Sequence, residues 1–371
     1  MSATRPAWAE VDVTAVALNV RAYAEAVAPA VVCAVVKADG YGHGAVPVAH
    51  AAVAGGAAWL AVATVEEGVE LREAGIEAPV LLLSEPAAEA AETVVAHRLT
   101  PTVYTEVGID TLAKAAAGSA HPLAVHLKVD TGMHRVGCRP DEACDLAAHV
   151  AAAAELELGG VLTHFAAADE PGHAFSAEQH ERFDAVLADL RARGVDPGIV
   201  HACNSAAALT VPQARHDMVR IGISLYGIPA ADELVGALRL VPVLALKARV
   251  THVQRVPAGE TVSYGVRYRV ERDTTIVTVP IGYADGVPRE LSFRGAEVLV
   301  GGRRCPIAGP ITMDQFMVDV GDLPVAHGDE VVLIGRQGAE EITVREWSGL
   351  LGTIPNAIVS GIGPRVPRLL V

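Results

Sequence analysis

The sequence predicts an α/β protein in which a TIM-type (β/α)8 barrel is followed by a C-terminal, mostly antiparallel β domain. The first observation is that short apolar runs alternate with amphipathic helical segments up to about residue 240, which is typical of parallel βα units. The second is that later runs are short, alternating and separated by glycine, proline and aspartate, as in antiparallel sheets. The third is the length of 371 residues, which accommodates a barrel and an addition.

Eight apolar runs in the first part fit the eight strands of a closed barrel. Amphipathic segments separate several of them, at residues 65–74, 86–97, 141–154 and 177–193. An open, doubly wound sheet is the alternative, but no Gly-x-Gly-x-x-Gly motif follows the first run. The expected strands cover residues 31–36, 59–63, 80–83, 102–104, 124–129, 160–164, 199–203 and 218–223.

The domain assignment places the barrel at residues 13–236 and the β domain at residues 1–12 and 237–371. Residues 7–13 alternate like a strand, and this strand is expected to pair with the β domain although it precedes the barrel. The expected strands of the β domain cover residues 244–250, 253–256, 275–279, 296–300, 318–320 and 330–334.

Composition excludes several classes of function. The net charge is −15, from 29 basic and 44 acidic residues, and no basic block occurs, which argues against nucleic-acid and anionic-membrane partners. No apolar run approaches the length of a membrane span, and the N-terminus lacks an export pattern. Five scattered cysteines without a Cys-x-x-Cys pair indicate reduced thiols and a cytoplasmic protein.

The stretch VVKADGYGHGA at residues 35–45 places Lys37 where a buried strand gives way to a glycine-rich turn. Burial disfavours the ammonium form of a lysine and leaves a nucleophilic amine, which enzymes that form Schiff bases need. A lysine that extends its amine to solvent from a strand end is the alternative.

Polar residues also follow several other expected strands. Active-site groups of a (β/α)8 barrel lie at the carboxyl ends of its strands, so these residues are expected to meet. Each alone has a structural alternative, such as a capping serine or a hydrogen-bonded core histidine. The residues are Lys37, Lys128, Asp130, His164, Asn204, Ser205 and Arg220.

These motifs resemble those of the alanine racemase family, and the resemblance extends over essentially the whole chain. It implies a cytoplasmic homodimer that uses pyridoxal 5'-phosphate to interconvert L-alanine and D-alanine, supplying D-alanine for peptidoglycan. The matching motifs are residues 34–45, HLKVDTGMHRVG at 126–137, THFAAADE at 163–170, residues 201–209 and 220–227, VSYG at 262–265, IGYADGVP at 281–288, MDQ at 313–315 and RVPR at 365–368.

The resemblance implies two bases on opposite faces of the substrate Cα. Lys37 binds the cofactor covalently and serves one face, and Tyr264 of the partner subunit serves the other. It also implies that Arg220 faces the pyridine nitrogen, and that His164 and Arg220 continue a hydrogen-bond chain toward Tyr264. Further cofactor contacts, mainly to the phosphate, are implied for Tyr41, Asn204, Ser205, Gly222 and Ile223.

For the substrate, the resemblance implies that Arg135 and Met313 receive the carboxylate. Lys128 matches a lysine that is often carbamylated in the family and that positions the arginine, whereas Tyr283 and Asp314 match entryway residues. The chain departs from the family at Asn356, where a tyrosine normally narrows the pocket. Asparagine is shorter and can hydrogen-bond a hydroxyl, so serine is an alternative substrate.

Other functions remain as alternatives. A decarboxylase of the same architecture would share the strand-end lysine but not the KADGYGHG and VSYG pairing. A pyridoxal-phosphate carrier would lack the C-terminal 130 or so residues, and a threonine aldolase relative would need metal ligands near the C-terminus. Because no carboxylate or cysteine recurs at ligand spacing, no metal is expected. The histidines considered for a metal are His43, His173, His180, His201 and His216.

Overall fold

The computed structural model describes residues 5–371, and these residues form two compact units. The barrel unit comprises Ala15–Gly40 and Ala45–Val241. The β unit comprises the N-terminal segment up to Thr14, Tyr41–Gly44 and Pro242–Val371. The short segment Tyr41–Gly44 therefore groups with the β unit, although the sequence analysis assigned it to the barrel. The assignment of residues 1–4 lies outside the described residues.

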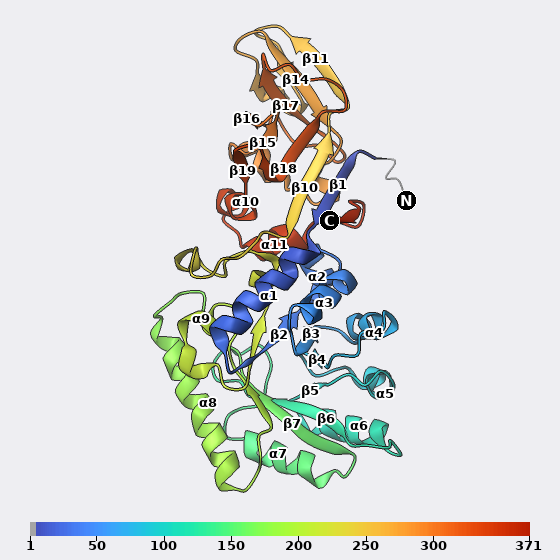
Figure 1. Ribbon diagram of the computed structural model, residues 1–371, viewed down its shortest axis with the longest axis vertical. Helices are drawn as coiled ribbons and strands as arrows, with labels where there is room; N and C mark the ends of the chain where they lie inside the picture. The colour runs from blue at the N-terminus through green and yellow to red at the C-terminus, as the bar shows by residue number, and fades with distance from the viewer. Residues whose placement is uncertain (1–4) are drawn as a thin grey trace. The chain divides into compact units, whose positions relative to one another are not determined.

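Eight parallel strands form the barrel in two four-stranded sheets, ordered β4-β3-β2-β9 and β5-β6-β7-β8 (Figure 1). Backbone hydrogen bonds join the sheets, from Thr100 N to Val80 O at 2.8 Å and from Arg220 N to Cys203 O at 2.9 Å. The predicted (β/α)8 barrel is confirmed. The strands are β2 (Val31–Val35), β3 (Trp59–Val62), β4 (Val80–Leu82), β5 (Thr102–Val103), β6 (Leu123–Lys128), β7 (Leu156–Leu162), β8 (Ile199–His201) and β9 (Met218–Ile221).

Helices lie outside the barrel strands (Figure 1), and polar caps start several of them directly after a strand. Thr64, two residues beyond β3, forms a capping box with Glu67, and the Thr105 hydroxyl accepts a hydrogen bond from Gly108 N. The helices of this part of the chain are α1 (Val13–Val27), α2 (Lys37–Gly42), α3 (Ala45–Ala54), α4 (Val65–Glu73), α5 (Ala91–Ala96), α6 (Glu106–Ala116), α7 (Ala143–Ala152), α8 (Ala174–Ala192) and α9 (Ala207–Thr210).

The β unit is mostly antiparallel, as predicted. Its main sheet has the order β16-β15-β18-β10-β1-β20, with β19 on β18; β11-β14-β17 and β12-β13 form smaller sheets. Strand β1 (Ala7–Val11) pairs with β10 (Leu244–Arg249) and with β20 (Arg368–Leu370). The other elements are β11 (His252–Val256), β12 (Thr261–Val262), β13 (Tyr268–Arg269), β14 (Thr274–Val279), β15 (Glu297–Val300), β16 (Arg303–Pro306), β17 (Phe316–Gly321), β18 (Glu330–Gln337), β19 (Glu340–Ile342), α10 (Val344–Leu351) and α11 (Pro355–Ser360).

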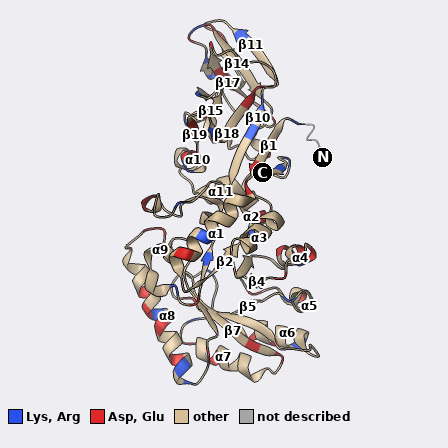
Figure 2. Cartoon of the chain, viewed as in Figure 1, with Lys and Arg blue, Asp and Glu red and all other residues tan. Residues whose placement is uncertain are grey.

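Short 3-10 helices occur in both units: η1 (Ala88–Ala90), η2 (Pro212–Ala214), η3 (Ile223–Tyr226), η4 (Asp232–Leu234), η5 (Tyr264–Val266), η6 (Tyr283–Asp285) and η7 (Arg289–Phe293). Figure 2 shows Lys and Arg dispersed over many elements, with acidic residues along α4 and α8. Between residues 5 and 371 no helix has both the length and the apolarity needed to cross a membrane.

Candidate active site

Lys37 begins a segment with an unusual backbone. All five residues at positions 38–42 have φ between +52° and +80°, and three of them are not glycine. A left-handed conformation costs roughly 1–2 kcal/mol for each such residue. Two carboxylates hold the segment, since Ala38 N donates to Glu67 Oε1 at 2.6 Å and Ala45 N donates to Asp39 Oδ1 at 2.9 Å. Backbone strain that is held in place by its surroundings is typical of functional sites.

Two lysines at this end of the barrel have lowered pKa values. Burial lowers the pKa of Lys37, and the charge of Arg135 lowers it further. Lys128 is the last residue of β6 and is buried. Its pKa is lowered to about 8, first by burial and then by the charges of Arg220 and Arg135. Both amines therefore lose their protons more readily than a surface lysine, as a nucleophile or a base requires.

Arg220 is a buried cation on β9, and only 3% of it is exposed. Its Nη2 donates to the carbonyls of Thr163 and Ala202, both at 2.8 Å, and to His164 Nδ1 at 3.1 Å. Burial lowers its pKa to about 10. No carboxylate in the described part of the chain forms an ion pair with Arg220. The guanidinium is thus held by neutral acceptors, and its charge remains available to a ligand.

The hydrogen bonds of Arg220 fix the tautomers of three histidines. A guanidinium only donates, so the nitrogens that it contacts, Nδ1 of His164 and Nδ1 of His201 at 2.8 Å, are acceptors. His201 must then carry its proton on Nε2, which donates to His126 Nδ1 at 2.9 Å. Burial and the charge of Arg220 lower the pKa of all three histidines, to about 4 for His126. The three imidazoles are therefore neutral.

Arg135 lies in the loop that follows β6. Hydrogen bonds between residues of this loop hold its two ends together. Asp130 N donates to Cys138 O at 2.8 Å, and Asp130 Oδ1 accepts from His134 N at 3.0 Å. Gly137 has φ +131°, and a Cβ there would lie 2.8 Å from Asp130 N, so only glycine fits.

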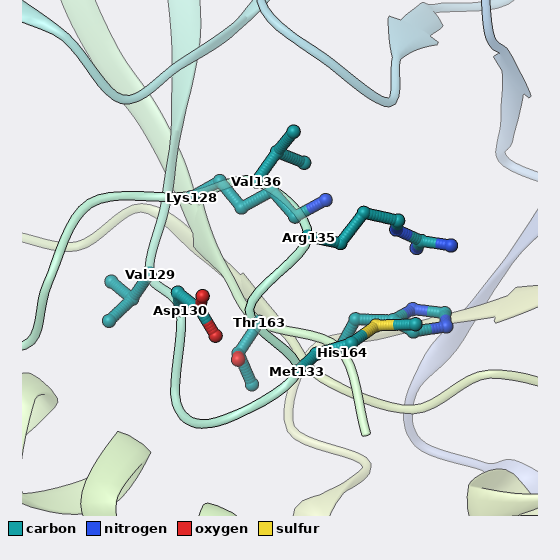
Figure 3. A pocket seen from close by; sticks show the side chains of 8 residues that line it. All are labelled: Lys128, Val129, Asp130, Met133, Arg135, Val136, Thr163 and His164. Carbon is teal, nitrogen blue, oxygen red and sulfur yellow. The ribbon is translucent and has the colours of Figure 1, made fainter. Parts of the chain in front are cut away.

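This loop and the end of β7 line a pocket. Figure 3 shows that the side chains of Lys128, Arg135 and His164 extend toward the same side of it. Arg135, together with Lys128 when its amine is protonated, suits this side of the pocket to a negatively charged ligand, and the neutral imidazole of His164 can hydrogen-bond it. The lining residues are Lys128, Val129, Asp130, Met133, Arg135, Val136, Thr163 and His164.

The predicted phosphate contacts lie after β8 and β9. The buried hydroxyl of Ser205 accepts a hydrogen bond from Gly222 N at 2.8 Å, and Ile223 starts η3 directly afterwards. Asn204 serves locally, because its Oδ1 accepts from Ala207 N at 2.9 Å. Phosphate sites in barrels of this type commonly lie after strands 7 and 8, which here are β8 and β9.

Tyr264 lies in the β unit on a strained and exposed loop. Its side chain is 72% exposed, although tyrosine rings are usually at least half-buried. Ser263 and Val266 have φ of +66° and +57°, a conformation that non-glycine residues avoid. The fold thus holds a large aromatic residue out in solvent on a backbone that carries strain.

The other predicted residues of the β unit are distributed over η6, the segment before β17, α11 and α2. Backbone bonds of 3.0 Å from Tyr283 N to Thr312 O and from Ala284 N to Met313 O hold η6 against the Met313 segment. Asp314 accepts a hydrogen bond from Arg365 at 2.6 Å. Asn356 is half-buried in α11, and Tyr41, with a pKa that burial raises to about 12, also belongs to the β unit.

Sequence reasoning missed two functional candidates, His126 and Glu67. The ring of His126 lies tilted against that of Trp59, with centroids 5.3 Å apart, and His126 is the last residue of the hydrogen-bond chain from Arg220. The carboxylate of Glu67 takes part in the capping box with Thr64 at the start of α4, and it also accepts a hydrogen bond from the backbone N–H of Ala38, the residue after Lys37. Both occur in stretches that read as ordinary strand and helix, so only their long-range contacts distinguish them.

Comparisons with known proteins agree with this arrangement. Residues 11–230 match the alanine racemase N-terminal domain family, and residues 243–370 match the alanine racemase C-terminal domain family. The alanine racemase of Symbiobacterium thermophilum is 50% identical over 366 residues, covering 98% of this chain and 97% of the relative.

Solved structures are similar over the full length as well. The crystal structure of alanine racemase from E. faecalis has a TM-score of 0.95 and 38% identity, covering 100% of both chains. The histidine racemase of Leuconostoc mesenteroides has a TM-score of 0.92 and 31% identity, covering 99% of this chain and 98% of that one. With two family domains and full-length relatives at this identity, the chain belongs to the alanine racemase family.

Proposed function

We propose that this isomerase interconverts L-alanine and D-alanine with pyridoxal 5'-phosphate, using Lys37 and the partner subunit's Tyr264 as bases. The observation that carries the proposal is the buried guanidinium of Arg220, which has neutral hydrogen-bond partners and lies among other basic groups at the strand ends. These groups suit a ligand that brings phosphate, carboxylate and a ring nitrogen that accepts a hydrogen bond.

The residues present fit this cofactor. Lys37 would hold it through its amine, whose pKa burial lowers. Ser205, Gly222 and Ile223 would hold its phosphate after β8 and β9, together with Tyr41. Arg220 would face the ring nitrogen and, as a permanent cation, keep it unprotonated.

When bound, pyridoxal phosphate withdraws electrons from the substrate Cα and so makes its proton acidic. Lys37 would then take or return that proton on one face, and the partner subunit's Tyr264 would do so on the other. Arg135 and the backbone of Met313 would orient the substrate carboxylate. His164, neutral and fixed by Arg220, would extend the hydrogen-bond chain toward the phenol.

The exposure of Tyr264 supports a shared site in a homodimer. A base that is 72% exposed in one chain needs a second surface to exclude water from the reaction. Other large apolar side chains of the β unit are exposed as well, including Val266 at 64%, Met313 at 52% and Phe293 at 44%. These exposures are compatible with a second subunit that covers them, although singly exposed apolar residues are also common on protein surfaces.

The experiment that tests the reaction follows L-alanine in deuterated buffer. The purified protein should exchange the Cα proton for deuterium while D-alanine appears and no carbon dioxide is released. Release of carbon dioxide would instead identify a decarboxylase of the same architecture. Visible absorption of bound cofactor without exchange would identify a non-catalytic carrier.

We also propose that Lys128 is carbamylated, its neutral amine adding to carbon dioxide with loss of one proton. Support comes from its pKa of about 8 and from the nearby charges of Arg220 and Arg135, which an anionic carbamate would stabilise. With 13C-bicarbonate, the protein is expected to show a carbamate carbon signal by NMR that strengthens as pH rises through about 8.

In this NMR experiment Lys128→Ala should lack the signal, whereas Lys114→Ala, which removes an exposed lysine on α6, should keep it. A native protein without the signal would contradict the carbamate.

Asn356 bears on the choice of substrate. The histidine racemase among the similar structures has the same fold with another substrate, so pocket residues rather than the fold set specificity. Asn356→Tyr is expected to lower the ratio of kcat/KM for serine to that for alanine by about 10-fold, because the larger ring excludes a longer side chain. Equal ratios in both proteins would remove serine as an alternative substrate.

The cellular role follows from the product. We propose that D-alanine is made in the cytoplasm and used for peptidoglycan. The five cysteines, all buried and free of disulfides, are compatible with a reducing compartment.

A further inference from the structure

Three side chains beside α8 form a compact cluster that contains none of the residues proposed for the reaction. His180 and Asp184 lie on α8, and His216 lies in the segment just before β9. The sequence analysis considered His173, His180 and His216 among its histidines and expected no metal. The ring of His173 caps α8 by accepting a hydrogen bond from Phe175 N. In the fold, His180 meets Asp184 and His216.

The cluster has the spacing of a ligand set. His180 and Asp184 are one helical turn apart, which places them on the same face of α8. His180 Nε2 lies 3.4 Å from Asp184 Oδ2, and His216 Nε2 lies 4.0 Å from Asp184 Oδ1. One ligand atom from each residue lies within 4.8 Å of the other two.

Two imidazole nitrogens of the cluster lack hydrogen-bond partners in the described structure. The side chains of His180 and His216 are only 13% and 17% exposed, and His216 Nε2 and His180 Nδ1 are buried without any hydrogen-bond partner in the described structure. A buried polar atom without a partner costs roughly 1–3 kcal/mol, so such atoms in native proteins call for an explanation. A ligand bound at His216 Nε2 would supply one.

Neighbouring residues hold His216 in position. The carboxylate of Asp217 accepts a hydrogen bond from Val200 N at 2.8 Å, and Asp217 N donates to Val200 O at 3.0 Å. The ring of Phe183 packs edge-on against the imidazole of His216, with centroids 5.7 Å apart. His216 itself has φ +47°. The site is therefore built before any ligand arrives, and Asp217 is already occupied by the backbone.

We propose that His180, Asp184 and His216 bind a divalent transition-metal ion of the Zn²⁺ type, with water completing the coordination shell. Two imidazoles and one carboxylate are the ligands that Zn²⁺ and its neighbours prefer, whereas Mg²⁺ and Ca²⁺ prefer oxygen ligands. Asp184 is 52% exposed, which leaves open positions for water.

The charges around the site are compatible with a cation. The charged groups that act on His216 are the carboxylates of Asp184 and Asp217 and the guanidinium of Arg191, and His180 is its other titratable neighbour. Two carboxylates against one guanidinium favour a cation at this place. The ion would connect α8 to the segment that leads into β9, which carries Arg220. Its role is thus to stabilise the barrel, without contact with the reacting atoms.

The test is calorimetric titration of Zn²⁺ into the chelator-treated holoenzyme, followed by thermal unfolding with and without Zn²⁺. The native protein is expected to bind one ion per chain and to gain a higher Tm. His216→Ala and Asp184→Asn should each weaken binding at this site at least about 10-fold and remove most of the Tm shift. His50→Ala, at an exposed histidine on α3, is the matched control and should behave as native.

Asp184→Asn is included because it preserves size at a half-exposed position and so avoids a folding defect. Absence of Zn²⁺ binding by the native protein would overturn the proposal. Binding that is equal in the native protein, Asp184→Asn and His50→Ala would overturn it too, because the ion would then sit elsewhere.

Discussion

Replacement of Lys37 by alanine is expected to lower kcat/KM for alanine racemisation by at least about 10³-fold, because one side chain holds the cofactor and serves as a base. Deuterium exchange at the Cα of both enantiomers should fall together. The measurement is exchange by NMR, starting separately from L-alanine and D-alanine, together with the visible absorption of the bound cofactor.

The control for Lys37→Ala is Lys114→Ala, which removes an exposed lysine on α6 far along the chain. It should retain native exchange and absorption. If Lys37→Ala kept both, Lys37 would be the solvent-extended strand-end lysine that the sequence left as an alternative.

Replacement of Tyr264 by phenylalanine is expected to act on one direction of the reaction. Removal of the Cα proton from one enantiomer should slow by about 10²–10⁴-fold, the usual contribution of a general base, while removal from the other enantiomer changes much less. The reason is that Lys37 remains intact on its own face. Separate single-turnover exchange measurements with each enantiomer report the two directions.

Tyr268→Phe provides the matched control for the loss of a phenol. Tyr268 is in the same unit, and its hydroxyl donates to Asp319 at 2.7 Å, so the variant loses a hydrogen bond without losing a proposed base. It is expected to lower stability and to leave the two directions equally affected. An equal loss in both directions for Tyr264→Phe would argue against its role as the base for one face.

Much of the fold could be predicted because it depends on local pattern. The eight barrel strands are short and apolar, and seven of them are followed by an α-helix, whereas β9 is followed by η3. Each strand lies where its apolar run predicted, with ends shifted by a few residues. For example, β7 begins at Leu156 rather than at residue 160 and ends before His164. After residue 241 the apolar runs become shorter and alternate with polar residues, and this change predicted the antiparallel sheets. Alternation of apolar and polar residues indicates a strand with one buried face.

The remainder depends on contacts between residues distant in sequence. The left-handed backbone at positions 38–42 is imposed by its surroundings, and propensity alone would forbid it at Ala38 and Tyr41. The tautomers of His201 and His126 follow from their hydrogen bonds to one another and to Arg220, which the sequence does not display. Lowered lysine pKa values have the same origin, since burial and neighbouring charges exist only in the folded chain.

The central claim is that each site combines Lys37 of one subunit with Tyr264 of its partner. Its most direct test is to co-express Lys37→Ala and Tyr264→Phe chains and to measure racemisation by the mixture. Random pairing makes about half of the dimers mixed, and each mixed dimer has one intact and one doubly altered site. The mixture should therefore recover about a quarter of native specific activity. If both residues act within one chain, no intact site can form, and activity would stay at the average of the two variants.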